Sequence, residues 1–427
     1  MPPTTAPTTT TTAPPTTAPT TTTTTTPPDD TWTPPWNVSP SGWLARDTPR
    51  VSVDRQGDAL LAWTACDPST QYCLNQIQAR RQSASGAPDS VLTLSPPGSD
   101  SAGPEVDSDD SGNAAVVWYQ DAQVVGRRIS ADGQLVGPLQ TLSTAAPAST
   151  PVVALSPDGD ALAAWTEVRD GTWYAVARQF RDDGSIGEPI TLGSTDPGWP
   201  GIGVDRSGRF VVAWSAGSYV AATRIEQDSA SPPQVLTSAI AAYGGFGMVR
   251  VGVDSVGDAV ISYRSGGGAH PQLWVSRWSG PGTLSDPIDV SSTDNVGFHH
   301  DLATDLEGDS ILVWTRWNGD NRIEMLGRQL SRAGTLGAVT SMGLYDRPEI
   351  ALDDDGDGLL VFHSPSPPYE AQEVGGRLIS SSGSFGNTQT LTSDGVCPHV
   401  DASPNDRFTV AWRQSSNPPS IHAIAGP

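Results

Sequence analysis

The chain has 427 residues, of which 24 are basic and 47 are acidic, so its formal net charge at pH 7 is −23. All of the basic residues are Arg, which excludes chemistry that needs a lysine nucleophile or a lysine-containing phosphate loop. Nucleic acids and anionic membranes require a basic surface, and no apolar run is long enough to span a bilayer. We therefore expect no nucleic-acid partner and no membrane insertion.

The first 28 residues consist almost entirely of Thr, Pro and Ala. Such a segment cannot bury enough apolar surface to fold, so we predict that residues 1–31 are a disordered linker and that residues 32–427 form one domain. Thr/Pro tethers are typical of secreted proteins, so we expect an extracellular or cell-wall location. The chain contains no apolar stretch that could serve as a signal-peptide core.

The rest of the chain repeats one motif eight times: Pro, four residues, Asp, two residues, Gly, five residues and an aromatic residue. Val249 and His300 replace the Pro in the fifth and sixth copies, Ser156 and Ser403 replace the Asp in the third and eighth, and Asp406 replaces the Gly in the eighth. A period of about 50 residues that is built from short strands indicates a radial array of β-sheets. The closing aromatic residues are Trp63, Trp118, Trp165, Trp214, Tyr263, Trp314, Phe362 and Trp412.

Each repeat contains four strand patterns, here named A to D. Strand A starts at the Pro or its replacement, and strand B runs from the Gly to the aromatic residue. Strand C contains an Arg in seven of the eight repeats, and strand D begins with another Pro. Strand B is apolar on both faces, so both of its faces must be covered. A blade of a propeller meets this requirement because it lies between two neighbouring blades.

The last repeat lacks a strand D, since the chain ends after a strand C predicted near residues 420–425. Residues 35–39 match the strand D pattern of residues 287–291. We therefore predict that the N-terminal strand completes the eighth blade and closes the ring. The predicted fold is all-β: an eight-bladed β-propeller of four-stranded antiparallel blades.

On these eight motifs the chain resembles secreted bacterial eight-bladed β-propeller repeat proteins. The resemblance covers nearly all of residues 32–427 and extends to the architecture only. Propellers include lectins, hydrolases, lyases and protein-interaction hubs, so the resemblance does not identify a function.

The loops divide into two sets on opposite faces of the predicted disc. The A–B turn has one length in all repeats, whereas the D–A and B–C loops vary, and variable loops on a rigid scaffold are typical of binding sites. Exposed aromatic rings beside polar residues suit the stacking of sugars, although such rings can also pack over the rim of a blade. The candidate ligand-binding residues are Trp173, Tyr174, Trp199, Tyr243, Trp317, Asp320 and Tyr369.

All six histidines fall in repeats five to eight, on the variable face or at its edge. They could supply a catalytic base or hold a metal, or they could be loop residues gathered by chance, since their spacing matches no metal motif. If the protein is an enzyme, the candidate catalytic residues are His299, His300, His363 and His399.

Two further features concern metal binding and disulfide formation. Asp353, Asp355 and Asp357 resemble the start of a calcium loop, but this segment is also the A–B turn of its repeat, so we expect a hairpin and no cofactor. Cys66 and Cys73 flank a B–C loop, where we predict a disulfide.

Taken together, these features predict a monomeric, non-catalytic extracellular binding module whose ligand is a glycan or a cell-surface protein. Two alternatives remain open at this stage. One is a polysaccharide-active hydrolase or lyase that uses the histidines of the same face, and the other is a purely structural spacer.

Overall fold

The computed structural model describes residues 32–426, except 71–72, 87, 196–197, 217–218, 238–247, 266–270, 281, 293–295, 319–321, 365–371 and 405–406. The predicted linker and the candidate residues Tyr243, Asp320 and Tyr369 therefore lie outside the described residues. Within the described part of the chain, no helix is long and apolar enough to cross a membrane.

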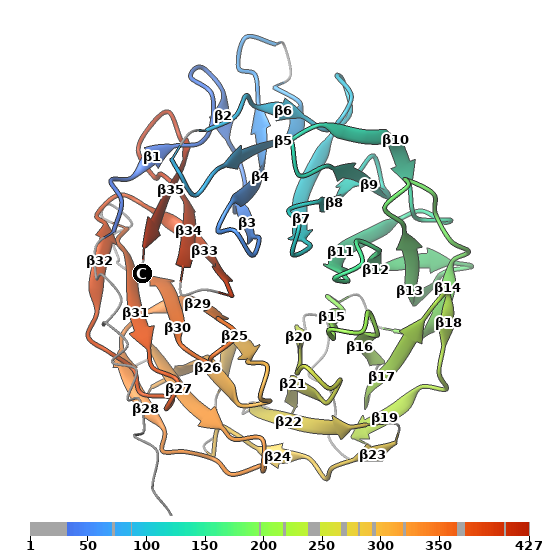
Figure 1. Ribbon diagram of the computed structural model, residues 1–427, viewed down its shortest axis with the longest axis vertical. Helices are drawn as coiled ribbons and strands as arrows, with labels where there is room; N and C mark the ends of the chain where they lie inside the picture. The colour runs from blue at the N-terminus through green and yellow to red at the C-terminus, as the bar shows by residue number, and fades with distance from the viewer. Residues whose placement is uncertain are drawn as a thin grey trace, which may run out of the picture.

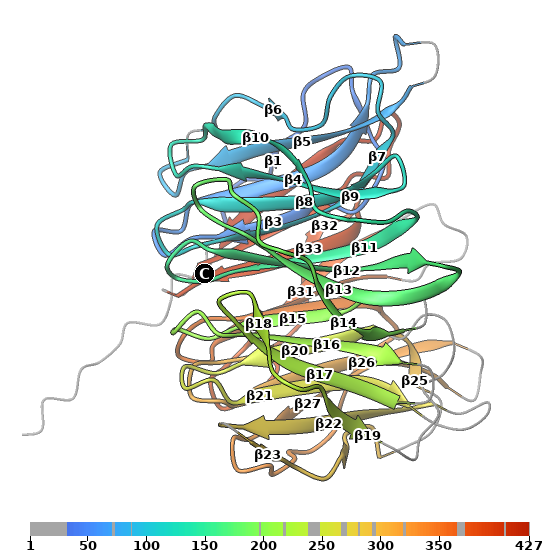
Figure 2. The same ribbon diagram turned by 90° about the vertical axis from the view of Figure 1, so that its right-hand side faces the viewer.

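The chain forms eight antiparallel sheets arranged around a central axis, which confirms the predicted eight-bladed propeller (Figure 1). In the side view the strands run across the thickness of the disc, so each strand has one end at each face (Figure 2). The strand nearest the axis is the predicted strand A. These inner strands are β3 (Arg50–Val53), β7 (Ser101–Ser108), β11 (Ala148–Leu155), β15 (Gly201–Val204), β20 (Val249–Val253), β25 (Val296–Thr304), β29 (Asp346–Leu352) and β33 (Val396–Ser403).

Two further strands in each blade correspond to the predicted strands B and C. The B strands are β4 (Ala59–Cys66), β8 (Ala114–Gln120), β12 (Ala161–Arg169), β16 (Phe210–Ala216), β21 (Ala259–Ser265), β26 (Ser310–Trp317), β30 (Gly358–His363) and β34 (Arg407–Arg413). The C strands are β5 (Asn75–Gln82), β9 (Gln123–Ile129), β13 (Thr172–Phe180), β17 (Tyr219–Glu226), β22 (Gln272–Ser279), β27 (Ile323–Leu330), β31 (Val374–Ile379) and β35 (Ile421–Gly426).

The outer strands correspond to the predicted strand D, and three short strands supplement the blades. The D strands are β6 (Leu92–Thr93), β10 (Leu135–Thr141), β14 (Ile190–Ser194), β19 (Gln234–Thr237), β24 (Ile288–Asp289), β28 (Thr340–Gly343), β32 (Gln389–Thr392) and β1 (Trp36–Asn37). The short additional strands are β2 (Leu44–Ala45), β18 (Ser229–Ala230) and β23 (Thr283–Leu284).

The N-terminal strand closes the ring, as predicted. In the eighth blade β1 pairs with β35, so that Trp36 lies opposite Ala423 and Asn37 lies opposite His422. The backbone N–H of Thr33 also donates to the carbonyl oxygen of Ala425 at 2.8 Å. The last blade is therefore built from both ends of the domain.

The core lies between neighbouring blades and is formed mainly by the B strands. Every residue of β4 is buried, and the motif aromatic Trp118 packs against Leu60, Ala62 and Ile77 of the preceding blade. Burial of a large apolar side chain contributes about 1.5–3 kcal/mol, and the motif supplies one such side chain in each blade. The repeated aromatic residue is therefore a structural element of the blade interfaces.

The constant A–B turn has a clear structural cause. In the first blade Asp54 Oδ1 accepts hydrogen bonds from the backbone N–H groups of Gln56 and Asp58, each at 2.9 Å. Gly57 has a φ of +80°, a conformation that a side chain would strain. The Asp-x-x-Gly part of the motif thus fixes the hairpin.

The predicted disulfide is present between Cys66 and Cys73, with their Cα atoms 5.1 Å apart. Cys397 is a free cysteine and is partly buried. The bond closes the B–C loop of the first blade, on the variable face.

Candidate functional site

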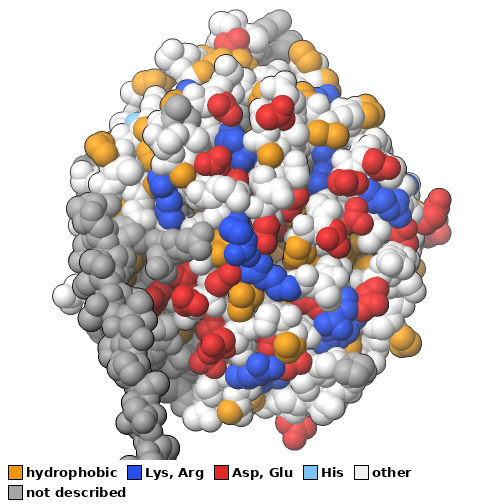
Figure 3. Space-filling view, viewed as in Figure 1, with side chains coloured by type: hydrophobic (Ala, Val, Ile, Leu, Met, Phe, Trp, Pro, Cys, Tyr) orange, Lys and Arg blue, Asp and Glu red, His pale blue; other side chains and the backbone are white. Residues whose placement is uncertain are grey.

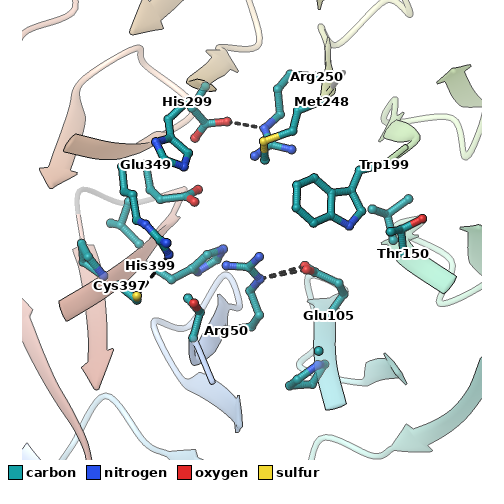
Figure 4. Close-up of a pocket in the computed structure, with 18 of the residues that line it drawn as sticks. Arg50, Glu105, Thr150, Trp199, Met248, Arg250, His299, Glu349, Cys397 and His399 are labelled. Atoms are coloured by element: carbon teal, nitrogen blue, oxygen red, sulfur yellow. Dashed lines mark hydrogen bonds and ion pairs between the residues drawn. The ribbon is translucent and has the colours of Figure 1, made fainter. Parts of the chain in front are cut away.

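A cavity of about 940 Å³ lies on the axis of the propeller, where the inner strands begin (Figure 4). Because strand A runs from the D–A loop to the A–B turn, the cavity belongs to the variable face. Residues from all eight blades line it.

One position of the repeat supplies much of the cavity wall: the residue that follows the motif Pro or its replacement. In every blade this residue lies opposite the residue that precedes the motif aromatic, as Arg50 lies opposite Ala62 in the first blade. Around the ring the position is occupied by Arg50, Glu105, Val152, Gly201, Arg250, Asp301, Glu349 and His399. All of these except Gly201 line the cavity.

Two ion pairs between neighbouring blades fix charges in this wall. Arg50 Nε lies 3.0 Å from both carboxylate oxygens of Glu105, and Arg250 Nε lies 2.8 Å from Asp301 Oδ1. Burial lowers the pKa of Arg50, but the charges of Glu105 and Glu349 outweigh burial and hold it above its ordinary value. Both guanidinium groups are therefore positively charged and held in place.

Glu349 differs from the other carboxylates of the wall. Its side chain points into the cavity in Figure 4, and it makes no hydrogen bond and no ion pair with any described residue. Burial raises its pKa, the nearby Asp301 raises it further, and Arg50 and Arg250 only partly compensate, so the pKa is about 7. Glu349 is thus a cavity carboxyl group that titrates near neutral pH.

Three of the four candidate histidines share this cavity, namely His299, His300 and His399. The fourth, His363, lies behind the wall, where its Nδ1 accepts a hydrogen bond from the backbone N–H of Cys397 at 3.3 Å. Because Cys397 lines the cavity, His363 supports the wall without lining it.

The four histidines have different surroundings. His299 Nδ1 lies 2.8 Å from Asp346 Oδ1, a contact that orients its imidazole ring. His399 Nδ1 accepts a hydrogen bond from the backbone N–H of Val51 at 3.3 Å. Burial lowers the pKa of His363 to about 4 and lowers the pKa values of His300 and His399 well below their ordinary range. These three rings, of which His300 is fully buried and the other two are partly buried, are therefore neutral at pH 7.

Of the aromatic candidates in the described part of the chain, Trp199 lines the cavity and is 41% exposed. Its ring lies across the cavity from Glu349 and His399 (Figure 4). Trp173 and Tyr174 are half-buried on β13, where Tyr174 packs against the core beside Arg169, with 5.8 Å from the guanidinium carbon to the ring centre. Trp317, at the end of β26, is 36% exposed and does not line the cavity.

A second acidic layer lies deeper along the same inner strands, three residues beyond the motif Pro. Asp401 Oδ2 accepts the backbone N–H of Val53 at 2.7 Å, and Asp107 Oδ2 accepts that of Leu155 at 2.7 Å. Burial raises the pKa of Asp401 to about 7 and that of Asp107 to about 6. These carboxyl groups join neighbouring blades through the free edges of the inner strands.

At the opposite end of the axis, side chains bridge the channel. Four residues that directly follow the first Asp-like position of the A–B turn form ion pairs: Arg206 reaches Asp354 at 2.7 Å and Asp110 at 3.1 Å, and Arg55 reaches Asp110 at 2.9 Å. In the space-filling view, basic and acidic side chains gather over the centre of this face (Figure 3). The cavity therefore lies at the end of the axis that these ion pairs do not bridge.

At Asp353, Asp355 and Asp357 the sequence predicts a hairpin and no cofactor; the hairpin is present, and the absence of a cofactor stays a prediction. Asp353 Oδ1 accepts the backbone N–H groups of Asp355 and Asp357 at 3.0 and 2.9 Å, which is the hairpin pattern of the other A–B turns. Among the described residues, no three His, Cys, Asp or Glu side chains are grouped so that they could hold a metal ion.

Several residues of the cavity wall were not anticipated from the sequence. They are Arg50, Glu105, Arg250, Asp301 and Glu349, together with Asp346, which does not line the cavity but contacts His299. A signal was available for most of them: the residue after the motif Pro changes from charged to apolar between repeats, while the surrounding motif stays the same.

The chain matches no family model and no curated protein. Among solved structures it is similar to the Dos1 propeller, with 11% identity, a TM-score of 0.54, and coverage of 92% of this chain and 94% of that chain. It is also similar to the propeller domain of the Trilobed protease from Pyrococcus furiosus, with 10% identity, a TM-score of 0.47, and 82% and 96% coverage. An ulvan lyase, a polysaccharide lyase, aligns with 9% identity, a TM-score of 0.47, and 89% and 94% coverage. At such identities the likeness shows the propeller fold alone.

Proposed function

We propose that the axial cavity binds a carbohydrate and that the protein is a monomeric, extracellular, non-catalytic binding module. The observation that carries this proposal is the position of Trp199, an exposed ring that faces a wall of charged side chains across a cavity of about 940 Å³. A sugar has apolar C–H faces that stack on an aromatic ring and hydroxyl groups that pair with carboxylates and guanidinium groups. The cavity offers both kinds of contact.

The ion pairs of the wall support binding of a rigid polar ligand. Glu105 and Asp301 already order the Arg50 and Arg250 side chains, so these side chains lose little conformational entropy when a ligand binds. The Thr/Pro-rich segment and the net charge of −23 support an extracellular setting, in which the glycan would belong to a polysaccharide or to a cell-surface protein.

The proposal can be tested by screening the full chain against a glycan array and measuring the affinity for the best ligand by calorimetry. Trp199→Ala should weaken binding at least tenfold, which corresponds to about 1.4 kcal/mol. Trp317→Ala is the matched control, because Trp317 is also exposed but does not line the cavity, and it should leave the affinity unchanged. An absence of glycan ligands, or equal affinities for both variants, would contradict the proposal.

A second candidate function, cleavage of a polysaccharide, is favoured by one observation. His299 is oriented by Asp346 at 2.8 Å and shares the cavity with Glu349, whose pKa is about 7, so a base and an acid face the same space. Incubating the protein with each bound glycan and assaying reducing ends and unsaturated products distinguishes the two functions. Product formation that is lost in His299→Ala would establish catalysis, whereas intact recovery of the glycan supports a binding module.

A further inference from the structure

At the repeat position that follows the motif Pro or its replacement, the charged groups do not balance. Two guanidinium groups, of Arg50 and Arg250, face three carboxyl groups, of Glu105, Asp301 and Glu349. Each guanidinium is held by the carboxylate of a neighbouring blade, at 3.0 and 2.8 Å. Glu349 is left without a hydrogen bond or an ion pair among the described residues. This repeat position therefore has one guanidinium group fewer than it has carboxyl groups.

The neighbouring strands do not supply the missing charge. Glu349 lies on β29, between β25 and β33. His300 and His399 of those strands are neutral at pH 7, because desolvation lowers their pKa values. His299 directs its Nδ1 to Asp346. The whole lining carries five carboxyl groups against three guanidinium groups, and the protein itself has a net charge of −23.

We propose that the cavity selects sugars that carry a primary amine, with the ammonium group at Glu349 and the sugar ring against Trp199. This inference rests on the proposed binding of a carbohydrate. The two side chains lie on opposite walls of the same cavity (Figure 4). The acidic field of the protein also raises the local concentration of cationic ligands and repels anionic ones.

A proton takes the place of the ammonium group when the cavity is empty. Burial and the nearby Asp301 raise the pKa of Glu349 to about 7, so a large fraction of this carboxyl group is protonated at neutral pH. An ammonium ligand favours the ionised form and displaces the proton. The charged and titratable groups that surround Glu349 in the cavity are Arg50, Glu105, Arg250, Asp301 and His399.

Acetylated and acidic sugars lack this advantage. An N-acetyl group is neutral, so it does not stabilise the ionised form of Glu349. A uronate adds a carboxylate beside Glu349. Two of the three guanidinium groups of the lining, those of Arg50 and Arg250, are already engaged by Glu105 and Asp301, and the third, that of Arg347, donates to Cys397 Sγ. Both classes should therefore bind less tightly than the free amine.

The test is calorimetric titration of the full chain with glucosamine oligomers, N-acetylglucosamine oligomers and galacturonate oligomers of equal length, and with a lysine peptide of equal charge. We expect the glucosamine oligomers to bind at least tenfold more tightly than the other three. Glu349→Gln should remove this preference, whereas Glu188→Gln, the same change at an exposed position outside the cavity, should retain it. Thermal unfolding of each variant verifies that it is folded, and Glu349→Asp, which keeps the charge, should keep the preference.

The possible outcomes separate this inference from the proposed function. Equal binding of acetylated and free amino sugars, or tighter binding of galacturonate, would overturn the amine preference and leave carbohydrate binding intact. Equal binding of the lysine peptide would show that charge alone is recognised, which also overturns the inference. If no oligosaccharide from the titrations or from a broad glycan array binds, the proposed function itself fails.

Discussion

Arg206 Nη2 lies 2.7 Å from Asp354 Oδ2, although the two residues belong to the fourth and seventh blades and are 148 positions apart. Because these blades are not neighbours, the contact spans the axis of the propeller. Asp110 of the second blade and Arg55 of the first extend the same network. The two ends of the axis therefore differ: one is bridged by ion pairs, and the other opens into the cavity.

Removing this network should affect stability without affecting the cavity. The Arg206 and Asp354 side chains are 32% and 27% exposed, so water screens their attraction. We expect Arg206→Ala to lower the free energy of unfolding by about 0.5–1 kcal/mol. Thermal unfolding measures the loss, with Arg322→Ala as an exposed control. Equal midpoints for the two variants, or weaker ligand binding in Arg206→Ala alone, would contradict this account.

Closure of the ring by β1 predicts a sharp boundary at the N-terminus. Deletion of residues 1–31 should leave the thermal midpoint unchanged, because the contacts of Thr33 and Trp36 with β35 are retained. Deletion of residues 1–39 removes strand D of the eighth blade, exposes an unpaired edge and should lower the midpoint and promote aggregation. Two deletion proteins with the same midpoint would show that the closing strand does not stabilise the ring.

The disulfide of the first blade should make a modest contribution to stability. Cys66 and Cys73 are separated by 7 positions, and closing a loop of this size in the unfolded chain is worth about 2 kcal/mol. Cys66→Ser should lower the free energy of unfolding by this amount. Cys397→Ser is the matched control, because Cys397 is not in a disulfide. An equally large drop in its free energy of unfolding would contradict the stabilising role of the Cys66–Cys73 bond.

The deeper acidic layer predicts a pH effect of definite sign. Burial raises the pKa of Asp401 in the folded protein to about 7, above its value of about 4 in an unfolded chain. The stability that comes from its protonated form is therefore complete below pH 4 and is lost as the pH rises through 7. The Asn of Asp401→Asn cannot ionise, so the free energy of unfolding of this variant should rise relative to that of the wild type between pH 5 and pH 8.5, by on the order of 2–3 kcal/mol.

This gain is measured as the difference between the thermal midpoints of Asp401→Asn and the wild type at each pH. The partly buried, neutral His363 has a lowered pKa of about 4 and destabilises both proteins alike as the pH falls below 6.5, so its effect cancels in the difference. Asp170 lies at an exposed turn, so the thermal midpoint of Asp170→Asn should change with pH in the same way as that of the wild type. If the thermal midpoint of Asp401→Asn also follows that of the wild type at every pH, the burial of the Asp401 carboxyl group is contradicted.

The architecture was predictable because each of its determinants is local. The strand D pattern of residues 35–39 identified the closing strand, and the spacing of Cys66 and Cys73 indicated the disulfide. Both rest on short segments whose chemistry is visible in the sequence. The number of blades follows from the repeat itself.

The cavity was less predictable, because it depends on which side of a strand faces the axis. Trp199 lies in the loop before β15 and Trp317 lies at the end of β26, both on the variable face, but only Trp199 lines the cavity. The pairing of Arg50 with Glu105, 55 positions away, exists only when two blades are side by side. Such contacts require the assembled ring, and no local pattern specifies them.

The most direct test of the central claim, that the carbohydrate occupies the axial cavity, uses the thiol of Cys397. This free cysteine lines the cavity, and its Sγ lies 3.3 Å from Arg347 Nη1. The rate of Cys397 alkylation is measured by mass spectrometry with and without a saturating oligosaccharide ligand. The account predicts that the ligand slows alkylation at least fivefold in the wild type and in Trp317→Ala. An unchanged rate at saturation would place the bound ligand outside the cavity and contradict the account.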